Sequence, residues 1–243
     1  MNDLNGQTAI ITGGSTGIGL GIARSLASAG CRVMLAGRNS ERLGMASAEL
    51  AKSGSQVSAM AGDVSAEADV ICLFAETDRI FGPVDLLVNN AGAFDGGPVE
   101  DLSLEAWNRV IGACLTGAFL CTREAFRRMK PRGRGRILNI GSISAQRPRM
   151  NSAAYTAAKF GVQGLTHATA LEGRSHGICV SCLHPGNVLV ERRINSGLAS
   201  DEEPMMSVEA ISRAAFTMLT MPPEVNFLEA IVLPNEQLYV GRG

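Results

Sequence analysis

The stretch Thr12-Gly13-Gly14-Ser15-Thr16-Gly17-Ile18-Gly19 decides the fold of this 243-residue chain. It follows a strand-like apolar run, Thr8–Thr12, and leads into a segment of helical period, Gly17–Ala29. A glycine-rich turn between a strand and a helix suits the pyrophosphate of a dinucleotide, because exposed backbone N–H groups and a helix N-terminus attract phosphate. The spacing GxxxGxG differs from the general GxGxxG fingerprint. A turn that only requires positive φ angles is the alternative interpretation.

Further apolar runs alternate with segments of helical period along the chain. Most runs are nearly continuously apolar, as is typical of parallel strands that are covered on both faces. The pattern predicts one α/β domain over residues 1–243, a Rossmann-type doubly wound parallel sheet of seven strands with helices on both faces. The predicted strands are Thr8–Thr12, Arg32–Ala36, Gln56–Ala61, Leu86–Val88, Arg136–Ile140, Ile178–Leu183 and Glu229–Leu233. The predicted helices are Gly17–Ala29, Ser40–Lys52, Ala66–Ile80, Leu104–Met129, Ser152–Ser175 and Val208–Met221.

Composition excludes several classes of partner. The formal net charge of −1 gives no basic field to attract nucleic acid. No apolar run approaches the roughly 20 residues of a membrane span, and the N-terminus lacks the pattern of a signal peptide. The histidines, at positions 167, 176 and 184, do not have the spacing of metal ligands. We therefore expect a soluble, cytoplasmic protein with no nucleic-acid, membrane or metal partner.

The end of the second predicted strand indicates which dinucleotide is bound. In this fold that position faces the adenosine ribose, where an acidic residue favours NAD and an arginine favours the 2′-phosphate of NADP. The chain has Gly37, which offers no carboxylate, followed by Arg38, whose planar donor fork suits phosphate. We predict NADP(H). A solvated loop charge is the alternative interpretation of Arg38.

Motifs in order along the chain resemble the short-chain dehydrogenase/reductase family, from about Gln7 to Gly186. The glycine-rich turn resembles the family's cofactor turn, Asp63-Val64 its adenine contact, and Asn89-Asn90-Ala91-Gly92 the element beside the two riboses. Pro185-Gly186-Asn187-Val188 resembles the segment that contacts the nicotinamide carboxamide. The resemblance, of an NADP-preferring type, implies cofactor contacts from Gly13, Ser15, Thr16, Gly17, Ile18, Gly19, Arg38, Asp63, Val64, Asn90, Ala91, Gly92, Tyr155, Lys159, Pro185, Gly186 and Val188.

Three residues are the candidate catalytic set. Tyr155 and Lys159 are four residues apart and share one face of a predicted helix, and they match the family's YxxxK. A tyrosine hydroxyl is a poor base at neutral pH, and an ammonium beside it favours the phenolate. Ser142, just beyond a predicted strand, matches the family serine and can hydrogen-bond a carbonyl oxygen. We predict an oxidoreductase that interconverts a ketone and a secondary alcohol, with Tyr155 as the acid/base.

Two positions depart from the family pattern. Cys114 precedes Leu115-Thr116-Gly117 where the family has an asparagine, and Val190 occupies the place of a threonine. A thiol is a weak donor and acceptor and is not expected to copy the two-sided hydrogen bonding of an amide. Cys114 therefore favours an alternative hypothesis, a non-catalytic or regulatory dinucleotide-binding protein on the same fold. An epimerase or dehydratase is a third hypothesis. Such enzymes often need an extra substrate domain, for which the short segment after Pro185 leaves little room.

The remaining segments indicate a substrate loop and an oligomer. The polar stretch 187–207 follows the sixth predicted strand and is expected to cover a small carbonyl or alcohol substrate, with a plain surface loop as the alternative. The resemblance implies a homodimer or homotetramer in which helix Leu104–Met129 and the helix of Tyr155 pair between subunits. His184 is either structural or close to the nicotinamide. The sequence leaves the substrate and the direction of the reaction open.

Overall fold

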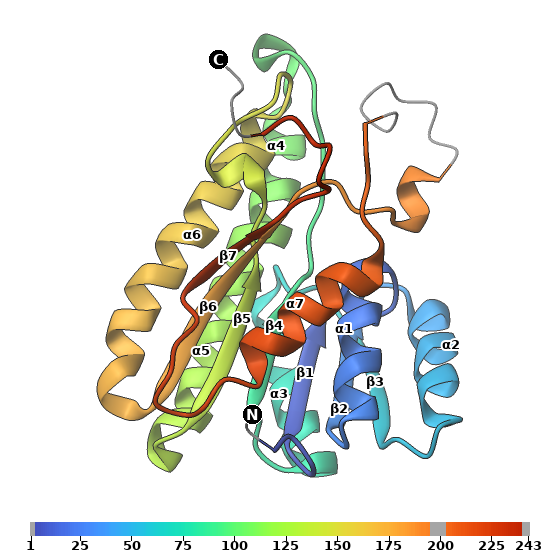
Figure 1. Cartoon of the computed structure of the whole chain (residues 1–243), viewed down its shortest axis with the longest axis vertical. Coiled ribbons are helices and arrows are strands. Elements are labelled where there is room, and N and C mark those ends of the chain that lie inside the picture. Colours follow the sequence, from blue (N-terminus) through green and yellow to red (C-terminus); the bar gives the residue numbers. More distant parts are fainter. Residues whose placement is uncertain (1–2, 195–202, 240–243) are drawn as a thin grey trace.

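A computed structural model describes residues 3–194 and 203–239. Its seven strands form one parallel sheet in the order β3-β2-β1-β4-β5-β6-β7, which confirms the predicted fold class (Figure 1). The strands are β1 (Thr8–Thr12), β2 (Arg32–Gly37), β3 (Val57–Ala61), β4 (Leu86–Asn89), β5 (Gly135–Ile140), β6 (Ile178–Pro185) and β7 (Glu229–Val232). The helices are α1 (Gly17–Ser28), α2 (Ser40–Ala51), α3 (Glu67–Phe81), α4 (Leu104–Ile111), α5 (Gly117–Met129), α6 (Ala153–Gly173) and α7 (Val208–Leu219).

Alternate residues of the central strands enter two separate cores, one on each face of the sheet. Ile11 of β1 packs with the apolar sides of α1, α2 and α7, whereas its neighbour Ile10 packs with α3 and α5. Successive strand side chains point to opposite faces, so a continuously apolar strand supplies both cores. On β6, Cys182 faces α6 and Leu183 faces the α1–α7 side. The continuous apolar runs of the sequence follow from this double covering.

One predicted helix is interrupted. The expected helix Leu104–Met129 consists of α4 and α5 joined by a π-helical turn, Gly112–Thr116. A π turn inserts one extra residue per turn and is often found at functional sites. Side-chain periodicity does not reveal so short an insertion, which explains why the sequence predicts one unbroken helix. The turn contains Cys114, the residue that departs from the family pattern.

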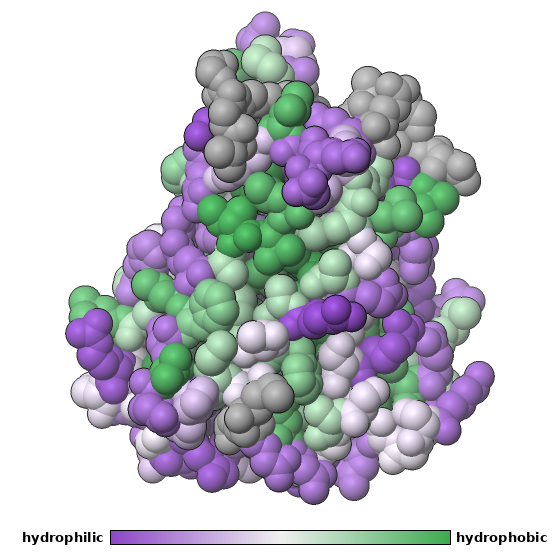
Figure 2. Space-filling model, in the orientation of Figure 1, coloured by the Kyte–Doolittle hydropathy of each residue, from purple (hydrophilic) through white to green (hydrophobic). Residues whose placement is uncertain are grey.

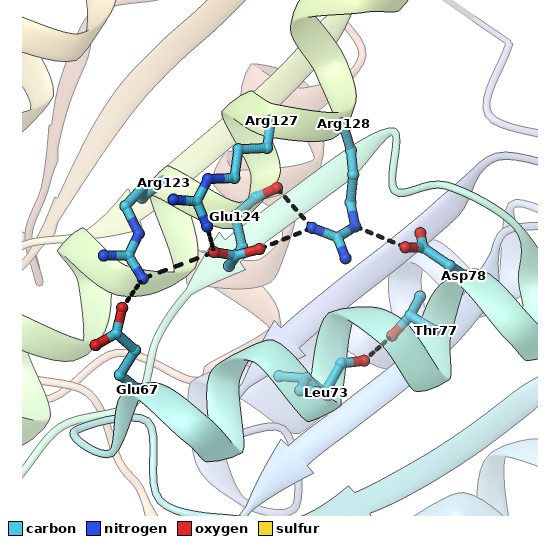
Figure 3. A network of polar contacts seen from close by, with 8 residues as sticks. All are labelled: Glu67, Leu73, Thr77, Asp78, Arg123, Glu124, Arg127 and Arg128. Atoms are coloured by element: carbon cyan, nitrogen blue, oxygen red, sulfur yellow. Dashed lines mark hydrogen bonds and ion pairs between the residues drawn. The ribbon is translucent and has the colours of Figure 1, made fainter.

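Ion pairs join α3 to α5 on the face of the sheet that both helices cover. The side chain of Glu124 is 4% exposed and lies between three arginines, Arg123, Arg127 and Arg128 (Figure 3). Arg128 also reaches Asp78 of α3 at 2.7 Å, and Arg123 reaches Glu67 of α3 at 2.5 Å. Each partner of the buried carboxylate is thus a charged group, which compensates its removal from water. This network fixes α5, and with it the π turn, against the rest of the domain.

Candidate active site

The predicted site residues gather at one edge of the sheet. Because all seven strands are parallel, their carboxyl ends lie together, and the order of the strands reverses between β1 and β4. Such a switch point forms the binding crevice in open α/β sheets. The glycine-rich turn follows β1, Arg38 follows β2, Asp63 follows β3, Asn90 follows β4 and Ser142 follows β5. The segment Pro185–Val188 continues from the end of β6.

The glycine-rich turn leaves the N-terminus of α1 open to an anion. Thr16 precedes the helix without forming a side-chain cap, and the first turn contains no acidic residue. The first backbone N–H groups of α1 are therefore free of a capping side chain, and the helix dipole adds a positive potential. A Cβ atom at Gly19 would lie 2.3 Å from the carbonyl oxygen of Gly13, so only glycine allows the helix to approach the turn this closely. This cradle fits a pyrophosphate.

Hydrogen bonds join this turn to the segment after β4. The side-chain nitrogen of Asn90 donates to the carbonyl oxygens of Thr12 and Gly13, each at 3.0 Å. In return, Oγ1 of Thr12 accepts from the backbone nitrogens of Asn90 and Ala91, also at 3.0 Å. Thr12 therefore shapes the site although the sequence marks it only as the last residue of a strand. Asn90 supports the turn, in addition to the ribose contact that the resemblance implies.

A pocket at the ends of β2 and β3 lies beside the predicted adenosine residues. Its lining includes Ala36, Met60, Asp63 and Val64. The backbone N–H of Ser65 lowers the pKa of the Asp63 carboxyl, partial burial raises it, and the Ser65 hydroxyl and the charge of Arg38 lower it further, for a net decrease. Asp63 is thus an anion at neutral pH, and the Arg38 guanidinium is close enough to affect it.

The candidate catalytic residues come together between β5 and α6. Lys159 is 5% exposed, and its Nζ donates to the carbonyl oxygen of Ile140 at 2.6 Å and lies 5.5 Å from the ring centroid of Tyr155. Burial lowers the pKa of Lys159, but the ionisable groups of Tyr155, Cys114 and Cys182 act in the opposite direction and the net shift is upward. The net shift favours the ammonium form of Lys159.

Ser142 begins a short 3₁₀ turn, Ile143–Ala145, that packs against α6. Its Oγ accepts a hydrogen bond from the backbone nitrogen of Ser144 at 3.1 Å. A hydroxyl that accepts from a backbone N–H keeps its own hydrogen for another acceptor. The serine is thus able to donate toward a carbonyl oxygen that binds beside Tyr155.

Cys114 both donates and accepts a hydrogen bond, which was not expected of a thiol at this position. Its Sγ donates to the carbonyl oxygen of Ala93 and accepts from the backbone nitrogen of the same residue, both at 3.3 Å. The expectation that a thiol cannot copy an amide here is therefore wrong. The reason is that both partners belong to one peptide segment, so a single polarisable sulfur reaches both. Cys114 is 2% exposed and packs with Val110 and Ala158.

Phe94 and Gln237 border the site without having been predicted for it, and so does Val190, which the sequence marked only as a departure from the family pattern. Phe94 lies edge to face against Tyr155, and Gln237, near the C-terminus, accepts a hydrogen bond from the backbone nitrogen of Asn187 at 2.9 Å. Val190 lies against Gly17, where a Cβ atom would be 3.2 Å from its Cγ1. These contacts join segments far apart in the chain, and no local pattern reveals them.

The two ends of the predicted loop 187–207 are hydrogen-bonded to each other. Val188 and Met206 form a parallel β-bridge, with the backbone nitrogen of Leu189 2.9 Å from the carbonyl oxygen of Met206. Residues 195–202 lie outside the described residues. Within residues 3–194 and 203–239, no group of three His, Cys, Asp or Glu side chains could hold a metal ion, and no helix is long and apolar enough to cross a membrane.

Comparison with known proteins identifies the family. The family profile described as short chain dehydrogenase matches residues 7–201. The chain belongs to this family. Like other short-chain dehydrogenases it is an NAD(P)-dependent oxidoreductase that acts on CH–OH groups. The family assignment and the observed sheet order agree with the resemblance found in the sequence.

Individual members of the short-chain dehydrogenase family are similar over most of the chain. Gluconate 5-dehydrogenase of Gluconobacter oxydans is 37% identical over 200 residues, which are 82% of this chain and 77% of that protein. D-beta-hydroxybutyrate dehydrogenase of Cupriavidus necator is 32% identical over 246 residues, 99% of this chain and 95% of that protein. The crystal structure of a variant of actinorhodin polyketide ketoreductase with NADPH has a TM-score of 0.88 at 31% identity, covering 98% of this chain and all of that one.

Proposed function

We propose that this short-chain dehydrogenase uses NADP(H) to interconvert a ketone and a secondary alcohol, with Tyr155 as the acid/base. The observation that carries the proposal is the buried Lys159 ammonium beside the Tyr155 ring, on the helix face that meets the end of β5. An ammonium at this distance stabilises a phenolate, which is the charge state that a tyrosine base needs. Ser142 supplies a hydroxyl hydrogen at the same strand end.

The nicotinamide would supply or accept the hydride, and the protein's residues handle the proton. During reduction, the Ser142 hydroxyl donates to the substrate oxygen and the Tyr155 hydroxyl gives it a proton as negative charge develops. During oxidation, the Tyr155 oxygen takes the proton from the alcohol. Lys159 stabilises the phenolate in both directions. The cradle between Gly13 and Gly19 would hold the pyrophosphate, and Pro185–Val188 would contact the nicotinamide.

Arg38 supports the choice of NADP(H) over NAD(H). Its side chain is exposed at the end of β2, and it forms no ion pair with any residue in the described ranges 3–194 and 203–239. Gly37 before it offers no carboxylate to a bare ribose. A guanidinium is therefore available to a 2′-phosphate. The similar structure of actinorhodin ketoreductase contains NADPH, so that relative binds the cofactor proposed here.

We also propose one domain over residues 1–243, a substrate-covering role for 187–207, and a homodimer or homotetramer. Large apolar side chains are exposed on the helices expected at the subunit interface, namely Leu104, Phe119, Phe160 and Leu171. A second apolar area lies over the edge strand β7, where Ile231 is exposed (Figure 2). Light scattering on purified protein tests the oligomer, and a monomer at micromolar concentration would contradict it.

The experiment that tests the function is a screen of NADPH oxidation across oxo acids, 3-oxoacyl thioesters, sugars, steroids and simple ketones. The expected result is turnover of at least one class by the wild type and its loss in Tyr155→Phe. The alternative is a non-catalytic dinucleotide-binding protein, and the contacts of Cys114 with both backbone groups of Ala93 support the catalytic function over it. It would be supported by tight NADPH binding without turnover on the whole panel.

A further inference from the structure

A buried histidine touches the peptide that carries Ser142. His184, at the end of β6, is 0% exposed, and its Nδ1 lies 3.0 Å from the carbonyl oxygen of Ser142. We propose that His184 is a positioning residue, which holds the Ser142 peptide and thereby aims the Ser142 hydroxyl at the substrate oxygen. The inference rests on the proposed role of Ser142, and it adds a residue that the cofactor and proton chemistry do not use.

The Ser142 peptide is fixed by hydrogen bonds on several atoms. Its carbonyl oxygen accepts from His184 Nδ1 and also from the backbone nitrogen of Ala145 at 3.0 Å. Its Oγ accepts from the backbone nitrogen of Ser144. The carbonyl carbon is bonded directly to Cα, so holding the carbonyl helps to fix the Cα–Cβ bond from which the hydroxyl projects. Of these three donors, His184 is the only side chain, and the other two are backbone N–H groups.

The close approach of the ring depends on Gly141. A Cβ atom at this position would lie 2.6 Å from Nδ1 of His184 and 2.8 Å from Sγ of Cys182. Any larger residue would therefore push the imidazole away from the Ser142 carbonyl. On the other side of Gly141, Lys159 Nζ donates to the carbonyl oxygen of Ile140. Two buried side chains thus hold the carbonyls that flank one glycine.

The opposite edge of the imidazole faces a carboxylate. Nε2 of His184 has no hydrogen-bond partner in the described part of the chain, and Oε1 of Glu229 lies 3.6 Å away. Partial burial raises the pKa of Glu229, but hydrogen bonds from Gln163 and His167 and the charges of His167 and His184 together lower it more, so the group is an anion at neutral pH. Those bonds, at 3.0 and 2.9 Å, anchor the carboxylate to α6. The anchored charge faces Nε2 while Nδ1 faces Ser142.

The contact with Ser142 restricts the protonation state of His184. A carbonyl oxygen only accepts hydrogen bonds, so Nδ1 of His184 must carry a hydrogen. The neutral form with hydrogen on Nδ1 and the doubly protonated form both meet this requirement. The neutral form with hydrogen on Nε2 does not, because two lone pairs would then face each other at Ser142. The tautomer of His184 is therefore a direct test of the contact.

Kinetics of two variants separate positioning from packing. In His184→Asn the side-chain amide nitrogen takes a place near that of Nδ1 and is able to donate, whereas His184→Leu fills similar volume without a donor. We expect His184→Leu to lower kcat at least roughly tenfold while the Kd for NADPH stays within about twofold. His184→Asn is expected to recover most of that loss. Equal losses in both variants, or none in either, would overturn the proposal; thermal unfolding checks that both fold.

Nitrogen NMR of the wild type tests the contact without any variant of the site. The chain has three histidines, so ¹⁵N-histidine labelling of the wild type with NADP⁺ bound gives few signals, and separate spectra of His167→Gln and His176→Gln serve only to assign them. The expected His184 pattern has a slowly exchanging hydrogen on Nδ1, and a tautomer protonated on Nε2 alone would overturn the proposal. If the wild type shows the Nδ1–H signal but reduces no ketone, the proposed function is contradicted, and the result supports only the hydrogen bond between His184 and Ser142.

Discussion

The rings of Phe94 and Tyr155 meet edge to face, with centroids 5.4 Å apart and planes inclined by 66°. Lys159 lies 5.5 Å from the centroid of the same tyrosine, one helical turn further along α6. Aromatic edges carry partial positive charge and ring faces partial negative charge, so both neighbours hold the phenol ring in a defined place. The position of the Tyr155 hydroxyl is therefore set by its surroundings, and removing only that hydroxyl isolates its chemical role.

Tyr155→Phe should cut turnover by at least roughly 10²-fold, the usual scale for losing a positioned acid/base. The ring contacts with Phe94 and Lys159 remain, so cofactor affinity should change little. Steady-state kinetics with the best substrate of the panel, together with NADPH titration, give both quantities. Turnover near that of the wild type would assign the proton transfer to another residue.

Arg38→Ala should weaken NADPH binding by roughly 1–3 kcal/mol and change NADH binding little, because a charged hydrogen bond to the 2′-phosphate is lost. Fluorescence titration with both cofactors measures the difference. Arg79→Ala is the matched control: it removes the same charge from an exposed site on α3, where Arg79 pairs with Glu76. Equal or tighter binding of NADH by the wild type would contradict the preference.

Much of the fold was predictable because both faces of the sheet are covered. A strand such as β1 is buried at every position, and its apolar centre, Ala9-Ile10-Ile11, is visible without any long-range information. The π turn at Gly112–Thr116 was missed because its insertion is too short to alter the apolar period. The contact of His184 with Ser142 and that of Gln237 with Asn187 were missed because each joins residues more than 40 positions apart. Such pairs depend on strand order and on register, which local patterns do not specify.

Glu124→Gln should destabilise the domain by roughly 1–3 kcal/mol, because it removes the buried negative charge that Arg123, Arg127 and Arg128 share. The side chain is 4% exposed and is held by Arg127 at 2.5 Å and by Arg128 at 2.9 Å (Figure 3). Urea unfolding followed by circular dichroism measures the change. The control Glu76→Gln breaks an exposed pair on α3 and should leave the midpoint unchanged. A midpoint unaffected by Glu124→Gln would mean that the network contributes nothing.

The thiols should differ widely in reactivity. Burial raises the pKa of Cys31 and of Cys121 to about 12 and that of Cys182 to about 11, so thiolate is scarce at pH 8. Cys72, by contrast, is exposed on α3. Brief treatment of native protein with iodoacetamide should therefore modify Cys72 first, as read by peptide mass spectrometry. Labelling in urea, where all six cysteines react, is the control, and rapid native labelling of Cys121 would contradict the buried position.

The last prediction concerns Cys114, whose sulfur bonds to both backbone groups of Ala93. Ala93 precedes Phe94, so this contact secures the chain that places the aromatic ring against Tyr155. Because the thiol already makes both bonds, Cys114→Asn should alter kcat by less than roughly tenfold, under about 1.4 kcal/mol of barrier. Cys114→Ala removes both bonds and should reduce kcat more than Cys114→Asn does. Cys121→Ala removes a buried thiol of α5 that packs in the core with α3, and it controls for the loss of a sulfur atom. An inactive wild type that Cys114→Asn strongly activates would show instead that the thiol fails in this place, and would favour the non-catalytic alternative.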